Sequence, residues 1–179
     1  MQSLKVALTI IIALLLQMVL PMVLPKDLPF FQYVDLALLI TVYFSLQRAP
    51  MIGMLVGVIG GIGQDAIGGG ILGVQGFAKT LLGYLVAIAS IRFSLENPLA
   101  RLGVVAVAAA AHTVLFAGLH MVLEDPLPYT AAWGQFGKVL GKTVLADGAA
   151  SLAVFALLDR IFPEQHAARR MAIGKRFYE

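Results

Sequence analysis

Long stretches of apolar residues recur along this chain, separated by short polar segments. Because an α-helix rises about 1.5 Å per residue, about 20 apolar residues are needed to cross the hydrocarbon core of a bilayer. Apolar residues make up 60% of the chain and charged residues 13%, which is more apolar surface than a water-soluble domain of this length can bury. The sequence therefore predicts an all-α, polytopic membrane protein.

We expect six transmembrane helices within a single domain over residues 1–162. Their predicted bounds are residues 4–24, 30–46, 51–67, 74–92, 102–123 and 139–162. Prolines and polar or glycine-rich turns separate these spans, and such residues end or break helices. The remaining residues, 163–179, form a basic tail.

The distribution of positive charge predicts how the helices are oriented. On the side of the two termini lie Lys5, Arg48, Arg92, Arg101, Arg160, Arg169, Arg170, Lys175 and Arg176, against Lys26 and Lys138 on the other side. Loops that remain in the cytoplasm carry an excess of Lys and Arg. We therefore expect a multi-pass protein with both termini, and hence the tail, in the cytoplasm.

Four ionisable residues inside the predicted spans form a candidate site: Asp65, Lys79, Lys142 and Asp147. An unpaired charge at mid-bilayer costs about 2.5–3.5 kcal/mol on insertion scales. We predict that the two acids pair with the two lysines, forming an intramembrane polar focus between the third, fourth and sixth spans. Three interpretations of these residues remain: ion pairs that lock helix packing, a ligand or ion site, and lysines that reach the membrane surface unpaired.

Glycines at a spacing of four residues predict smooth helix faces that another backbone can approach closely. Gly53, Gly57 and Gly61 form such a face on the third span, and Gly137 with Gly141 begins one on the sixth. These faces are interpreted as helix-packing surfaces within the chain or as contact surfaces for a partner.

Several functions are disfavoured by what the sequence contains. The chain has no cysteine, which excludes thiolate metal sites and a cysteine nucleophile. His112 and His120 lie two helical turns apart, too far to bind one metal together, and no phosphate-binding loop or nucleophile–base spacing is evident. The net charge of +3 is scattered and does not suggest nucleic acid. We expect no catalytic, metal-binding or cofactor-binding residues, and a protein that is not an enzyme.

The order of motifs in the central part of the chain resembles the MreD family of bacterial rod shape-determining membrane proteins. The resemblance rests on Val34–Leu39, Tyr43, Arg48-Ala49-Pro50, the glycine-rich span Gly53–Gly63, the block Gln64–Gly76, and Gly83–Val86 before Arg92. The positions that match the family are Asp35, Asp65, Gly68 and Gly73. Gln64 and the triple glycine after Asp65 depart from the family's commoner Leu-Asp-x-x-x-Gly form.

This resemblance implies a scaffold of the cell-wall elongation complex in the bacterial inner membrane. The implied partners are an MreC-like protein, the wall synthase RodA with its class B penicillin-binding protein, and MreB and RodZ, besides membrane lipids. The resemblance also implies a helical fold like that of the substrate-binding components of energy-coupling-factor transporters. Such a vitamin-binding component is the alternative function.

Overall fold

The computed structural model is all-helical in the residues it describes, which are 2–23, 29–93, 95, 97–123, 127–130 and 132–163. These residues form the α-helices α1 (Gln2–Val23), α2 (Leu36–Ser45), α3 (Pro50–Gly68), α4 (Val74–Arg92), α5 (Pro98–Val122) and α6 (Trp133–Ile161), and the short 3-10 helices η1 (Pro29–Tyr33) and η2 (Pro128–Thr130). The predicted all-α class is confirmed. Residues 164–179 of the predicted basic tail lie outside the described residues.

Within the described residues, three helices, α3, α4 and α5, are long and apolar enough to cross a membrane. Helices α3 and α4 have 19 residues each, which corresponds to about 28 Å and approaches the thickness of the hydrocarbon core. Their bounds lie within one residue of the predicted spans 51–67 and 74–92. The apolar stretch of α1, Leu4–Val19, and the whole of α2 are shorter.

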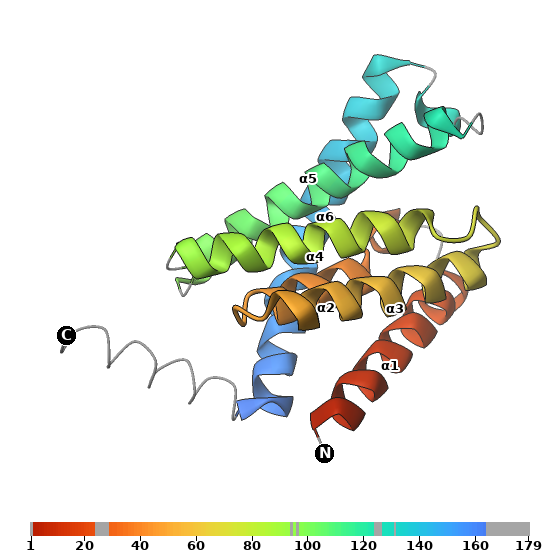
Figure 1. Cartoon of the computed structure of the whole chain (residues 1–179). Coiled ribbons are helices and arrows are strands. Elements are labelled where there is room, and N and C mark those ends of the chain that lie inside the picture. Colours follow the sequence, from red (N-terminus) through yellow and green to blue (C-terminus); the bar gives the residue numbers. More distant parts are fainter. Residues whose placement is uncertain are drawn as a thin grey trace.

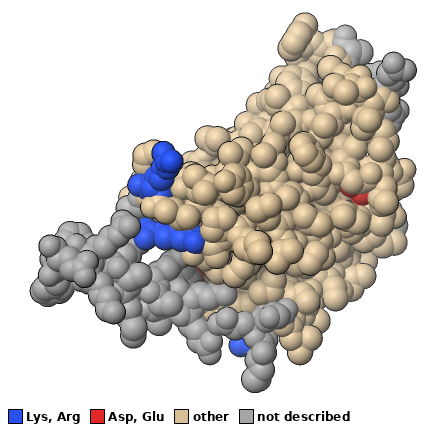
Figure 2. Space-filling view, viewed as in Figure 1, with Lys and Arg blue, Asp and Glu red and all other residues tan. Residues whose placement is uncertain are grey.

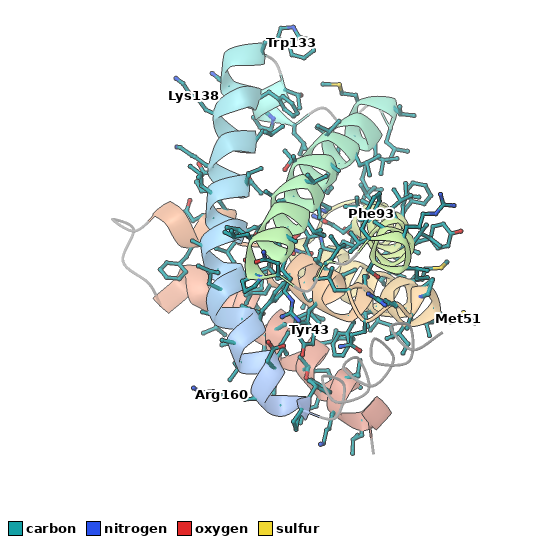
Figure 3. The ribbon with its side chains drawn as sticks, turned by 90° about the vertical axis from the view of Figure 1, so that its left-hand side faces the viewer. Tyr43, Met51, Phe93, Trp133, Lys138 and Arg160 are labelled. Carbon is teal, nitrogen blue, oxygen red and sulfur yellow. The ribbon has the colours of Figure 1, made fainter. Side chains whose placement is uncertain are left out.

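The helices pack around α2. Helices α3 and α4 lie side by side and antiparallel, α5 runs obliquely across α4, and α6 crosses the α3–α4 pair steeply (Figure 1). Helix α2 contacts all five other α-helices. The outer parts of α5 and α6 project beyond the α3–α4 pair, as both Figure 1 and Figure 3 show.

The second predicted span, residues 30–46, is wrong as a continuous helix. The chain forms η1 and then α2, which has 10 residues and is about 15 Å long, half the thickness of the hydrocarbon core. Asp35 ends the irregular segment by capping α2, which is why the helix starts there. Every residue from Ala37 to Ser45 is buried, so other helices cover this short helix.

A short turn over residues 69–73 connects α3 to α4. Gly69 at φ 68° ends α3, and Gly73 at φ 99° precedes α4. Glycine adopts these left-handed conformations without the steric cost that a side chain would incur. The glycine-rich sequence therefore allows the chain to reverse within five residues and to lay α4 back along α3.

Aromatic side chains join the short α2 to α6. Tyr43 packs against Phe155 with ring centroids 5.4 Å apart, and Phe44 meets Phe162 edge to face at 5.3 Å. Figure 3 shows Tyr43 between α6 and the helices behind it. These contacts anchor the C-terminal half of α6 to the core.

Candidate functional site

A buried group of charged side chains lies at the N-terminal end of α2. Asp35 is the N-cap of this helix, and its Oδ1 accepts a hydrogen bond from the backbone N–H of Leu38 at 3.0 Å. Aspartate is among the preferred N-cap residues because its carboxylate satisfies a free amide of the first turn. The partial positive charge of the helix N-terminus further stabilises the carboxylate.

Lys79 of α4 supplies the positive charge opposite Asp35. Its side chain is completely buried, and its Nζ lies 2.7 Å from Oδ2 of Asp35. The same Nζ lies 2.5 Å from Oε1 of Gln75 and 3.1 Å from Nε2 of His112. An ammonium group has three N–H donors: one is directed at Oδ2 of Asp35 and one at Oε1 of Gln75, whereas Nε2 of His112 accepts from Lys79 only in the tautomer that carries its proton on Nδ1.

Gln75 and His112 complete the surroundings of Lys79. Gln75 lies one turn before Lys79, and thus on the same face of α4. His112 comes from α5 and is buried; its Nε2 is 2.8 Å from Oε1 of Gln75, and its Nδ1 is 3.9 Å from Oδ2 of Asp35. The amide and the imidazole therefore form a polar shell around the ion pair.

Asp147 brings α6 into the same group. Its side chain is completely buried, and its Oδ1 accepts a hydrogen bond from the backbone N–H of Asp35 at 2.7 Å. The residues Asp35, Gln75, Lys79, His112 and Asp147, which we name the charge cluster, thus come from α2, α4, α5 and α6. A single hydrogen-bonded group joins four helices that are distant in the sequence.

The predicted pairing of Asp65 and Asp147 with Lys79 and Lys142 is wrong, because the ion-pair partner of Lys79 is Asp35. Lys142 is exposed, with its Nζ 5.2 Å from the ring centroid of Tyr33, a cation–π arrangement. Lys142 precedes Asp147 by five residues, which turns the two side chains roughly 140° apart around α6. Only Asp147 therefore faces the cluster.

Asp65 caps α4 instead of pairing with a lysine. Its Oδ2 accepts hydrogen bonds from the backbone N–H groups of Gly73 at 2.8 Å and Gln75 at 3.1 Å, with Gly76 at 3.4 Å. These amides begin α4 and have no partner within the helix. The carboxylate is buried and fastens the end of α3 to the start of α4.

Replacing Asp65 by Ala should lower the free energy of unfolding by about 1–2 kcal/mol, because the substitution leaves buried amides of α4 without acceptors. Reversible unfolding of the purified protein in detergent measures this loss. Lys142→Ala is the matched control: removal of an exposed cation–π contact should cost less than about 1 kcal/mol. Equal losses in the two variants would contradict the capping role of Asp65.

The predicted glycine face of α3 packs against α4 within the chain. Gly53, Gly57 and Gly61 are all buried, and a Cβ atom at Gly57 would lie 2.6 Å from the backbone oxygen of Lys79. By contrast, nothing lies within 4 Å of a Cβ atom at Gly137 or Gly141 on α6. The α3 face is therefore closed by α4, whereas the α6 face is open.

Sequence reasoning missed three members of the charge cluster as site residues. From the sequence, Asp35 is identified only as a family-matching position, His112 is considered only for its distance from His120, and Gln75 only as part of the motif block Gln64–Gly76. One local signal was present, because an aspartate immediately before an apolar run is a typical N-cap. Nothing local shows that Lys79, 44 residues further along the chain, faces that cap.

The hydrogen bonds and the ion pair of the charge cluster join helices to one another. Within the described part of the chain, no group of three or more His, Asp and Glu side chains could hold a metal ion. The buried serines of α2 and α4 lie toward the other ends of these helices and donate to backbone carbonyls of their own helix, Ser45 to Thr41 and Ser90 to Ala87. The arrangement can hold helices and charges in place.

A comparison with protein families identifies the family of this chain. The profile of the family described as rod shape-determining protein MreD matches residues 1–126, which include every member of the charge cluster except Asp147. Comparisons with curated proteins and with solved structures return no match. Since the family match covers most of the chain, this protein belongs to the MreD family of rod shape-determining proteins.

Proposed function

We propose that this protein is a non-catalytic scaffold of the cell-wall elongation complex in the bacterial inner membrane. In this role it links an MreC-like protein, the wall synthase RodA and its class B penicillin-binding protein to cytoplasmic MreB and RodZ. The observation that carries the proposal is the match to the MreD family over residues 1–126. The charge cluster supports it, because four helices tied together at one buried point give a stable framework for binding partners.

The proposed topology has six membrane crossings, including the short α2 with η1, and both termini in the cytoplasm. Figure 1 supports it: the start of α1, the end of α6 and the α2–α3 and α4–α5 connections lie toward one end of the molecule. The α3–α4 and α5–α6 connections lie toward the opposite end. Blue side chains of Lys and Arg are visible at the first of these ends (Figure 2). By the bounds of the helices, the described basic residues of this end are Lys5, Arg48, Arg92, Arg101 and Arg160.

The exposed face of α6 is our proposed contact for the membrane helix of the MreC-like partner. Trp133, Gly137, Gly141 and Leu145 follow one another at a spacing of four residues and so form one row along the helix surface. Trp133 is 89% exposed and Leu145 is 72% exposed, and both glycines are open. In Figure 3, Trp133 lies at the end of α6 that is remote from the core. Large side chains on either side of two glycines leave a notch that a partner helix can enter closely.

A substitution that fills this notch tests the proposal. Gly141→Leu should weaken co-purification with the MreC-like protein about tenfold or more, which corresponds to about 1.4 kcal/mol, and should fail to restore rod shape in cells depleted of the wild-type protein. Gly103→Leu is the matched control, because Gly103 lies within a helix and, as at Gly141, nothing lies within 4 Å of a Cβ atom added there. If both variants bind and restore shape like the wild type, the α6 face is not the contact.

The alternative function, a vitamin-binding component of a transporter, finds less support in the described residues. The charge cluster is filled by its own side chains, which bond to one another. A hollow of about 120 Å³ between α1, α2 and α6 is lined by Thr9 and otherwise by apolar side chains. A vitamin needs polar groups that fix its orientation as well as apolar walls, so this hollow does not favour that function.

A further inference from the structure

One oxygen of the charge cluster lacks a partner. Oδ1 of Asp147 accepts the hydrogen bond from the backbone of Asp35, but Oδ2 of Asp147 has no hydrogen-bond partner among the described residues. The whole side chain is buried and lies against the N-terminus of α2, a helix of 10 residues. A buried, ionised carboxylate oxygen without a hydrogen-bond donor destabilises the folded protein.

The charges around Asp147 do not cancel when both acids of the cluster are ionised. Among the described residues, the charge cluster surrounds Asp147 with Asp35 on α2, Gln75 and Lys79 on α4, and His112 on α5. Gln17 on α1 lies at the same end of α2, where its Oε1 accepts from the N–H of Ala37 at 3.4 Å. With both acids ionised and the histidine neutral, two negative charges face the one ammonium group of Lys79. That ammonium group already engages Asp35, Gln75 and His112. One negative charge is then uncompensated in a buried site, which is strongly unfavourable.

We propose that Asp147 is a proton-binding site, with Oδ2 carrying a bound proton in the folded protein and the cluster therefore neutral. When two acids lie close together in a buried site, one of them binds a proton more tightly, because both cannot ionise without repulsion. Asp35 is the ionised member, because its Oδ1 accepts from Leu38 and its Oδ2 accepts from Lys79. Asp147 is the protonated member, because one of its oxygens receives no donor.

A proton on Asp147 affects the contact between α6 and α2. Asp147 lies on α6, beyond the residues that match the family profile, and its contact with Asp35 joins α6 to the N-terminus of α2. Loss of the proton would place a second negative charge near the carboxylate of Asp35, and the repulsion between the two acids would act between α6 and the N-terminus of α2. The charge state of Asp147 is therefore coupled to how α6 sits on the rest of the protein.

Infrared spectroscopy of the purified full chain in a detergent without ester groups, at neutral pH and without sodium or potassium, tests the proposal. A neutral carboxyl group absorbs above the amide I band, where a carboxylate does not, and the band shifts when the solvent is changed to D₂O. We expect such a band in the wild type and its loss in Asp147→Asn. If the wild type shows no such band, or if the band persists in Asp147→Asn, the proposal is wrong.

The unfolding of two matched variants gives a second measurement. Asn resembles a neutral aspartic acid in shape and keeps the oxygen that accepts from Asp35, so Asp147→Asn should unfold at nearly the same temperature as the wild type. Asp35→Asn removes the charge opposite Lys79 and should unfold at a clearly lower temperature. If Asp147→Asn fails to fold, or loses as much as Asp35→Asn, a charged Asp147 is required and the proposal is overturned. Neither measurement involves a partner, so this inference can fail while the scaffold function stands.

Discussion

Replacing Lys79 by Met should lower the free energy of unfolding by about 3–5 kcal/mol, the loss typical of removing one partner of a buried ion pair. The methionine keeps much of the volume of the lysine, so the loss reports charge rather than packing. In the variant, Oδ2 of Asp35 loses its contact with the ammonium at 2.7 Å and the carboxylate remains buried. Unfolding in detergent, followed by circular dichroism, measures the change.

A double substitution separates the ion pair from other effects of Lys79. If the lost stability comes from the unpaired carboxylate, Lys79→Met combined with Asp35→Asn should be more stable than Lys79→Met alone, because the second change removes the uncompensated charge. Lys142→Met serves as the control for an exposed lysine and should have little effect. A double variant that is less stable than Lys79→Met by the full cost of Asp35→Asn would show that the two residues act independently.

Replacing Gly57 by Ala should destabilise the protein by about 1–3 kcal/mol, and Gly57→Leu should prevent α3 and α4 from packing at all. The new Cβ atom would lie 2.6 Å from the oxygen of Lys79 and 2.8 Å from the nitrogen of Thr80. These are backbone atoms of α4, so the helix must move as a whole to relieve the overlap. The displacement would also disturb Lys79, which lies on the same turn.

A glycine with no neighbours provides the comparison for Gly57. Nothing lies within 4 Å of a Cβ atom at Gly103 on α5, so Gly103→Ala should leave stability unchanged or raise it by up to about 1 kcal/mol through helix propensity. Thermal unfolding of both variants in the same detergent compares them directly. A Gly57→Ala variant as stable as Gly103→Ala would mean that the two helices do not pack as closely as the structure shows.

The helices with long apolar runs could be predicted closely from the sequence, and α2 could not. The bounds of α3 and α4 follow from Pro50, the glycines that end α3, and the length of the apolar runs. The stretch 30–46 is equally apolar, and hydropathy alone does not distinguish a helix that faces lipid from one covered by protein. Asp35 fixes the start of α2 because its side chain caps the N-terminus of the helix. The prediction followed the apolar pattern and did not use this capping residue.

The candidate site could be predicted in part, by the cost of charge in a membrane. That cost singled out Lys79 and Asp147 as residues in need of partners, and both belong to the charge cluster. It gave no information on which acid faces which base, and so the pairing was predicted wrongly. Asp65 lies close to the backbone amides at the start of α4, and these N–H groups donate hydrogen bonds to its carboxylate. The carboxylate therefore needs no lysine as a partner.

The sequence by itself determined that the chain is a helical membrane protein of the MreD family and that glycines line one face of α3. Those properties depend on composition, on spacing along one helix and on motif order, all of which are local. Only the tertiary structure decided that Asp35, Lys79, His112 and Asp147 meet, and that α4 rather than a partner covers the α3 glycines. The physical reason is that the meeting of side chains from four helices depends on the rotation and crossing of each helix, which arise from packing of the whole core.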